Sequence, residues 1–420
     1  MPTPRVVVYL SALAVTFGSS ACHVGRFVVR NFANITDHRF FPAAAVEVGD
    51  APGVLATAQQ RYGVDTLSIS VNGERMRLDD YLDDETTTEA FLVVRGDSVV
   101  YERYFDGRDT SDISTTFSVT KSVTSLLIGI AVDEGHIDDV DDPVTRYLPE
   151  LVEEHPYWQR LTLRHCLDMR SGLDYAESYS SPFAHMAKLY YGTNSGRQIR
   201  KLGFDAEPGT RKEYQSATTQ VLGMVLERAT GVPYADYLEE KVWQPMGMEH
   251  AATVSLDSEK HGVAKAYSGL NTTARDLAKI GMLYARGGRW RGRQIVSEDW
   301  VRASVTADTS NGNYQYQWYA ATEDHRDEAG AVVYYDTEAA ALAATAALSL
   351  EGARAWRSKR QEGKYYLSYL SGAFYAQGIM NQHIYVDPAR DIVIVRQGRK
   401  WDSGYLTLYG ALARRLGAEA

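Results

Sequence analysis

The most distinctive hydrophobic segment covers residues 116–130. It is apolar on nearly every face, and no charged residue separates Lys121 from Asp133. A helix that is hydrophobic all round is a buried helix. The pattern therefore predicts a buried helix that begins near Ser118 and ends near Gly135, because glycine is a common stop signal.

Apolar runs near both ends of the chain predict strands. Residues 91–94 and 99–101 flank a turn that contains Gly96, whereas residues 382–386 and 392–396 flank a turn that contains proline. Each pair predicts a β-hairpin. Helical periodicity fills the sequence between the hairpins. The predicted helices cover residues 161–169, 218–230, 234–242, 272–287 and, at the end of the chain, 405–416.

These elements predict an α+β protein, in which an antiparallel sheet built from both chain ends is flanked by helices and interrupted by a helical subdomain. An alanine-rich, charged stretch at 320–370 predicts a helical insertion on the surface. The predicted parts are a signal peptide at 1–21, a tether and N-terminal lead-in at 22–85, two pieces of an α/β part at 86–134 and 266–420, and the helical subdomain at 135–265.

The first 22 residues follow an export pattern. Arg5 precedes an apolar run at 6–17, and the small residues at 18–21 lead to Cys22. This order is typical of a signal peptide. A cysteine after small residues resembles a bacterial lipobox, although Ser19 stands where leucine is usual. We expect an exported protein that a lipid on Cys22 holds at a membrane, facing the periplasm or the cell exterior; an ordinary signal peptide is the alternative.

Composition narrows the range of functions. The 420 residues are 45% hydrophobic and 23% charged, which is ordinary for a globular protein. A net charge of −10 argues against a nucleic-acid partner. No protein partner is predicted. The ten histidines form no His-Glu-x-x-His pair, and the sequence has no phosphate loop and no Gly-x-Ser-x-Gly motif.

A serine and a lysine give the buried helix its candidate chemistry. Ser118 and Lys121 are three residues apart, so their side chains share one face of a helix. The unpaired N–H groups at a helix start favour a developing anion. Burial disfavours the ammonium form of Lys121, which can then accept the Ser118 proton as a neutral amine. The alternative is a Ser-x-x-Lys sequence that occurs by chance.

Two further positions could complete such a site. Tyr214 precedes a predicted helix and could pass a proton to the leaving group; a packed aromatic is the alternative. Gly378 allows close backbone approach, and the N–H of Ile379 could face an oxyanion. A strand-edge bulge is the alternative for that segment.

In this order and spacing, the motifs resemble those of the serine β-lactamase-like hydrolases: class C β-lactamases, family VIII esterases and 6-aminohexanoate-dimer hydrolases. The likeness covers roughly residues 85–320 and 370–415. It rests on residues 117–122, 161–173, 214–216 and 378–388.

The resemblance implies a β-lactamase/transpeptidase-like fold with the active site between its two parts. It also implies an acyl-enzyme serine hydrolase without metal or cofactor. Ser118 would be the nucleophile, Lys121 the base and Tyr214 the proton shuttle. The N–H groups of Ser118 and Ile379 would form the oxyanion hole.

The resemblance also suggests which residues touch the substrate. Ser216 replaces the asparagine of the family's Tyr-x-Asn motif, and Gly378 belongs to the strand that flanks the site. Tyr175, in a tyrosine-rich loop, would hydrogen-bond a substrate amide. The usual Lys-Thr-Gly is Ala-Gln-Gly at 376–378, so the cation that holds a β-lactam carboxylate is missing.

These departures favour a small ester or amide as the substrate and resemble the 6-aminohexanoate branch. A β-lactamase or penicillin-binding D-peptidase is the first alternative. The second is a binding lipoprotein that has the same fold but no catalytic activity.

Overall fold

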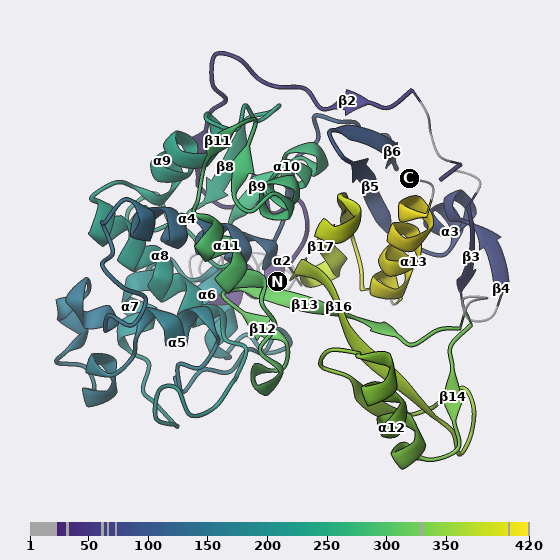
Figure 1. Cartoon of the computed structure of the whole chain (residues 1–420). Helices are drawn as coiled ribbons and strands as arrows, with labels where there is room; N and C mark the ends of the chain where they lie inside the picture. Colours follow the sequence, from purple (N-terminus) through teal and green to yellow (C-terminus); the bar gives the residue numbers. More distant parts are fainter. Residues whose placement is uncertain are drawn as a thin grey trace, which may run out of the picture. The chain divides into compact units, whose positions relative to one another are not determined.

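The computed structural model describes residues 23–30, 33–59, 63–64, 67–71, 74–327, 331–401 and 404–418. Its elements fall into two compact units (Figure 1). Unit 1 comprises Met1–Val54 and Ser111–Asp276, and unit 2 comprises Leu55–Thr110 and Leu277–Ala420. Within the described ranges, no helix is long and apolar enough to cross a membrane. The predicted helical range 135–265 falls in unit 1, whereas 86–134 is divided between the units.

Unit 1 consists of helices and one small sheet. The antiparallel sheet has the order β1-β8-β9-β7. Its strands are β1 (Ala43–Val46), β7 (Ser114–Thr115), β8 (Ala252–Ser255) and β9 (Leu270–Thr272). Its helices are α2 (His23–Arg30), α4 (Val119–Asp133), α5 (Leu163–Leu167), α6 (His185–Tyr191), α7 (Ser195–Arg200), α8 (Ser216–Thr230) and α9 (Tyr234–Leu238), and α10 (Ala274–Ala285) leads into unit 2.

Helix α4 confirms the predicted buried helix. Ser118 is its N-cap residue, and every residue from 119 to 131 is buried. The helix stops at Asp133, where the Glu134 N–H still bonds the Ile130 carbonyl. Thr124 Oγ1 donates to the Ala266 carbonyl at 2.6 Å, which fixes α4 against the segment before β9. Burial of the helix on all sides and this hydrogen bond together hold its first turn in place.

The other predicted helices of unit 1 are also present, with bounds that differ by about two residues at their ends. Helix α8 ends where Gly231 takes a left-handed φ of 70°, as its sequence predicts. The predicted helix 234–242 is α9 followed by one π-helical turn, Glu239–Trp243. Cys166 on α5 is buried, and burial raises the pKa of its thiol.

Unit 2 is organised around a ten-stranded sheet. The main path has the order β12-β13-β16-β17-β18-β5-β6-β2, with β14 and β15 paired to β16. Its strands are β2 (Ala56–Thr57), β5 (Thr88–Arg95), β6 (Ser98–Tyr104), β12 (Tyr314–Gln315), β13 (Trp318–Asp324), β14 (Tyr334–Tyr335), β15 (Arg354–Arg357), β16 (Tyr365–Gly378), β17 (Gln382–Asp387) and β18 (Ile392–Gly398). Two further hairpins are β3 (Ser68–Val71) with β4 (Glu74–Arg77), and β10 (Arg289–Trp290) with β11 (Arg293–Gln294). The helices are α3 (Leu78–Asp84), α11 (Glu298–Val305), α12 (Glu338–Leu348) and α13 (Tyr405–Gly417).

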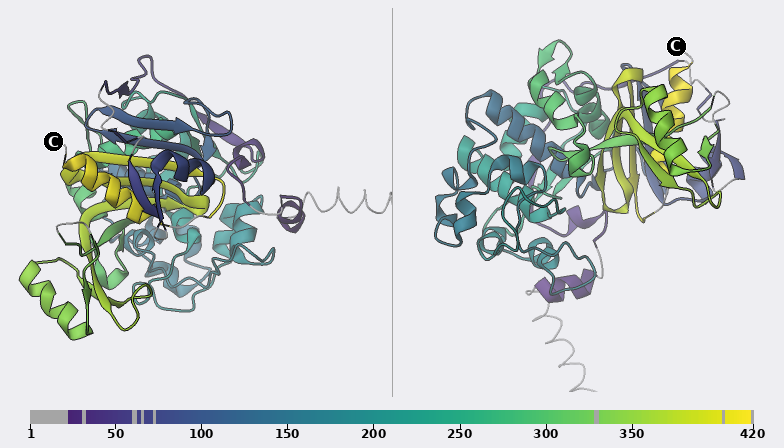
Figure 2. Two further views of the ribbon diagram at one scale, coloured as in Figure 1. Left: turned by 90° about the vertical axis from the view of Figure 1, so that its right-hand side faces the viewer. Right: turned by 60° about the horizontal axis from the view of Figure 1, so that its bottom comes forward.

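Both predicted hairpins are present, as β5–β6 and β17–β18. They join in one sheet because β18 pairs antiparallel with β5, with Val393 opposite Val94. The closing helix α13 lies along one face of these strands (Figure 2), where Tyr409 packs in the same apolar core as Phe91 and Tyr385. The α+β fold and the sheet built from both chain ends are thus confirmed.

The segment predicted as a surface insertion is only partly helical. Helix α12 exposes most of its alanines and buries Ala341 alone among its residues. The chain on either side of α12 forms strands. Residues 365–370 are rich in tyrosine and leucine, of which tyrosine favours strands, and they form the first part of β16. Strands β14 and β15 pair with this extension.

A close contact between α8 and the chain before β9 generates a prediction about stability. A Cβ atom at Gly223 would overlap Ala266 Cβ. Alanine normally favours a helix over glycine by about 1 kcal/mol. We nevertheless expect Gly223→Ala to lower the free energy of unfolding by about 1–3 kcal/mol, because no space is left for a methyl group between α8 and Ala266. Urea denaturation measures the change.

Gly196→Ala in α7 is the matched control, since the nearest atoms to its added Cβ lie at 3.9 Å. Its stability should stay unchanged or rise. If both variants gained stability equally, the packing argument would be wrong.

Candidate active site

The first turn of α4 brings the predicted nucleophile and base together. Lys121 Nζ lies 2.8 Å from Ser118 Oγ and donates to the Tyr267 carbonyl at 3.0 Å. Only 1% of the Lys121 side chain is exposed. The Tyr267 carbonyl is a feature that the sequence did not indicate, because residues 264–268 follow neither a helical nor a strand pattern.

Local backbone structure fixes where this turn begins. The Thr116 N–H and hydroxyl both donate to the Leu270 carbonyl at 2.9 Å, next to the pairing of β7 with β9. Phe117 then takes a left-handed φ of 49° directly before Ser118. A non-glycine residue in this region is held there by its surroundings. Ser118 is therefore placed by a sheet contact on one side and a buried helix on the other.

Burial shifts the protonation of the lysine. Desolvation lowers the pKa of Lys121 to about 8, and the Glu177 carboxylate opposes part of that shift. A group with this pKa is partly neutral near pH 8. The amine can then accept a proton from Ser118, which is what a general base requires.

Tyr214 joins the pair from the start of α8. Lys121 Nζ lies 5.0 Å from the centre of the Tyr214 ring and 5.7 Å from that of Tyr267. The structure thus brings together the three predicted catalytic residues in unit 1. Their catalytic roles are taken up under the proposed function.

Glu177 is a site residue that the sequence analysis missed. Its carboxylate accepts the Ser216 N–H at 2.7 Å, the Ser216 hydroxyl at 2.7 Å and the Tyr179 hydroxyl at 2.6 Å. Asp174 lies in the same loop but is exposed. No feature of the sequence separates these two acidic residues, since only folding places one of them at the N-terminal end of α8.

The predicted substrate-binding residues in this loop have partners within the protein. The Ser216 hydroxyl is held by Glu177. Tyr175 is buried, and its hydroxyl donates to Met186 Sδ at 3.1 Å while its ring stacks on His185. Contact of Ser216 or Tyr175 with a substrate amide therefore stays a prediction.

Gly378 and Ile379 lie in unit 2. Gly378 is the last residue of β16, where it pairs regularly with Gln382. Ile379 begins a short helical turn in which Met380 takes a left-handed φ of 62°. The oxyanion-hole role of the Ile379 N–H stays a prediction. Cys22 lies outside the described residues, and among those described no group of three or more histidine, cysteine or acidic side chains could hold a metal ion.

Comparison with known proteins shows the family of the chain. The Beta-lactamase family model matches residues 79–404. A 6-aminohexanoate-dimer hydrolase of Paenarthrobacter ureafaciens is 30% identical over 314 residues, which is 69% of this chain and 76% of the relative. Esterase EstB of Burkholderia gladioli is 32% identical over 162 residues, covering 35% of this chain and 40% of the esterase.

Solved structures share the fold. A protein of Bacillus anthracis, provisionally named a 6-aminohexanoate-dimer hydrolase, aligns with a TM-score of 0.72 at 23% identity and covers 91% of this chain and 93% of its own. A class C β-lactamase mutant aligns with a TM-score of 0.51 at 14% identity, over 81% of this chain and 94% of its own. At these identities the likeness shows the fold alone. With the match over residues 79–404, the chain belongs to the beta-lactamase family, as its motifs predicted.

Proposed function

We propose that this protein hydrolyses a small ester or amide through an acyl-enzyme on Ser118. The observation that carries the proposal is the 2.8 Å contact between Ser118 Oγ and the amine of a buried lysine. Neutral Lys121 takes the hydroxyl proton as Oγ attacks the substrate carbonyl carbon. Tyr214 passes a proton to the departing alcohol or amine, and water then releases the acid from Ser118.

Charged residues that are present or missing in each unit support this choice of substrate. Glu177 adds a carboxylate near Lys121, and residues 376–378 lack the lysine that holds a β-lactam carboxylate. Both features disfavour an anionic substrate. The similarity to the 6-aminohexanoate-dimer hydrolase and to esterase EstB supports an amide or an ester.

One relative supports a second candidate. The D-alanyl-D-alanine-carboxypeptidase/endopeptidase AmpH of Escherichia coli (strain K12) is 24% identical over 237 residues, covering 53% of this chain and 60% of the relative. A D-peptidase would form the same kind of acyl-enzyme, but a penicillin would trap it.

We further propose that the protein is exported and anchored through a lipid on Cys22. The support is the order of a positive residue, an apolar run and small residues before that cysteine.

The acyl-enzyme has a direct test. Brief incubation with p-nitrophenyl acetate should add one acetyl group to Ser118, detected by intact-mass spectrometry and peptide mapping, and turnover should follow. Ser118→Ala should lose the adduct and at least about a thousandfold in kcat/KM. Lys121→Met should lose nearly as much, because nucleophile and base act as a unit.

Ser125→Ala on the same helix is the matched control, since it also deletes one buried hydroxyl. It should keep full activity. A lasting penicilloyl adduct from penicillin G, without ester turnover, would instead assign the protein to the D-peptidases. Full activity in Ser118→Ala would refute the mechanism.

The pKa of Lys121 sets the pH dependence. The amine must be neutral to act as a base, so kcat/KM should rise with pH through a limb near pH 8. The Glu177 carboxylate favours the ammonium form and raises this pKa. Glu177→Gln should therefore move the limb to lower pH. Glu154→Gln, which removes an exposed carboxylate from the same unit, should leave it in place. A limb that stays or moves upward in Glu177→Gln would contradict the assignment.

The lipid anchor can be tested in bacteria fed radiolabelled palmitate. The wild-type chain should incorporate label and sediment with membranes, whereas Cys22→Ser should carry none. Cys166→Ser should be labelled normally, because this buried cysteine is the only other one in the chain. Equal labelling of wild type and Cys22→Ser would exclude the anchor.

A further inference from the structure

Helix α2 and the loops beside it form an unusual surface of unit 1, with apolar side chains outside and basic side chains around a cavity. We propose that this surface docks on a bilayer that contains anionic phospholipid, with a lipid phosphate bound in the cavity. The inference concerns lysine and histidine side chains that the proposed acyl-enzyme chemistry does not use, but its choice of a lipid phosphate rests in part on the lipid proposed for Cys22.

Helix α2 packs on the protein through two arginines and a phenylalanine, and the Phe27 ring meets the Tyr191 ring edge-on with centroids 5.7 Å apart. Arg26 donates to the Tyr191 carbonyl at 3.4 Å. The guanidinium of Arg30 lies 4.0 Å from the centre of the Phe40 ring. Two valines of the same helix face outward. Apolar side chains left in solvent beside basic ones are typical of a helix that lies in a membrane interface.

Three apolar side chains of this region are largely exposed. Val28 and Val29 are 65% and 64% exposed, and Phe183 is 69% exposed. Phe183 lies close to α2. His23, the first residue of the helix, hydrogen-bonds through its ring to the backbone of Pro182, which directly precedes Phe183. These side chains can enter the boundary between headgroups and acyl chains, where phenylalanine and aliphatic residues are favoured.

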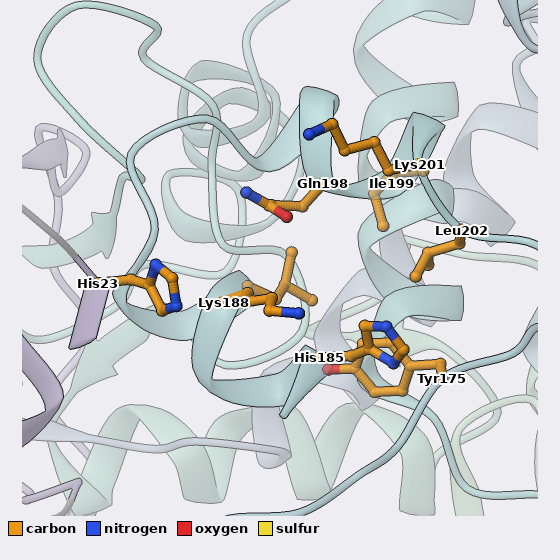
Figure 3. A pocket seen from close by; sticks show the side chains of 9 residues that line it. His23, Tyr175, His185, Lys188, Gln198, Ile199, Lys201 and Leu202 are labelled. Atoms are coloured by element: carbon orange, nitrogen blue, oxygen red, sulfur yellow. The ribbon is translucent and has the colours of Figure 1, made fainter. Parts of the chain in front are cut away.

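A basic cavity of about 360 Å³ lies directly beside the helix. Its lining includes His23, His185, Lys188, Gln198 and Lys201. Figure 3 shows Lys188 between His23 and the His185 ring, which stacks on Tyr175. A cavity of this size holds a small ligand.

The charges of the cavity are those that bind a phosphate. Within the part of the chain that the structure describes, neither Lys188 nor Lys201 forms an ion pair. The Ala176 N–H donates to His185 Nδ1 at 3.2 Å, so the other ring nitrogen of His185 is the donor available to a ligand. Ammonium groups and imidazole N–H groups bind phosphate oxygens.

The position of the cavity in the chain favours a lipid phosphate over a free one. His23 lines the cavity and follows Cys22 directly. A lipid on Cys22 would hold the cavity close to the headgroups. The net charge of −10 gives no general attraction to an anionic surface, so the local lysines must supply it.

Vesicle binding tests the proposal on the full chain with Cys22→Ser, which removes the lipid. Cosedimentation is measured with vesicles of phosphatidylcholine alone and of phosphatidylcholine mixed with phosphatidylglycerol. We expect binding at least about tenfold tighter to the mixed vesicles. Lys188→Gln/Lys201→Gln should lose about tenfold or more of that affinity. Val28→Ser/Val29→Ser should also bind more weakly. Any contribution from residues 1–21 is the same in every variant.

Two matched controls separate this face from the rest of unit 1. Arg146→Gln/Arg228→Gln removes the same formal charge from two arginines that each pair with a carboxylate. Val54→Ser removes a valine of similar exposure, 67%. Both controls should bind mixed vesicles like the parent. Thermal unfolding and p-nitrophenyl acetate turnover, unchanged in every variant, show that the fold is intact.

Three results would overturn the proposal. The first is equal binding of parent and lysine variant to mixed vesicles. The second is tight binding of inorganic phosphate in calorimetry, abolished by Lys188→Gln/Lys201→Gln, without vesicle binding; this would assign the cavity to a soluble anion. The third is a dimer in analytical ultracentrifugation that Val28→Ser/Val29→Ser dissociates, again without vesicle binding, which would assign the apolar face to a second copy.

Discussion

A lysine that is held out of water is the constraint on which unit 1 depends. The ammonium of Lys121 would be poorly solvated on a fully buried helix, and among the described residues its hydrogen-bond partners are Ser118 and the carbonyl of one other residue. The amine is usable because that carbonyl, at Tyr267, is held in place by contacts of the same chain segment. Thr124 binds the adjacent carbonyl, and Gly223 lets α8 approach it. Packing at some distance from the reacting atoms therefore sets the chemistry of the amine.

The sequence predicted those parts of the site that depend on local periodicity. Ser118 and Lys121 share one helical turn, and the turn is buried because its neighbours are apolar, so both facts were visible in one short segment. The two hairpins that form the sheet were also visible, because their turns contain glycine or proline. Tyr214 was found by its place before a helix and by resemblance to a family.

Contacts between distant segments could not be predicted in this way. Glu177 acts on Lys121 only because a loop meets the N-terminal end of α8, and nothing in its own neighbourhood distinguishes it from Asp174. The stretch at 320–370 was predicted only in part. Its alanines form helix α12, as expected, but the tyrosines that follow extend β16, and pairing with β14 and β15 organises that part of the chain.

The buried thiol of Cys166 has a practical consequence for studying this protein. Reactivity toward alkylating reagents requires an accessible thiolate, and burial both covers this sulfur and raises its pKa. With Cys22 replaced by serine, the chain has no other thiol. A cysteine introduced at any exposed position would then be the one site that takes a fluorophore or spin label. Distances and motions in the protein thus become measurable by labelling, without first removing a core residue.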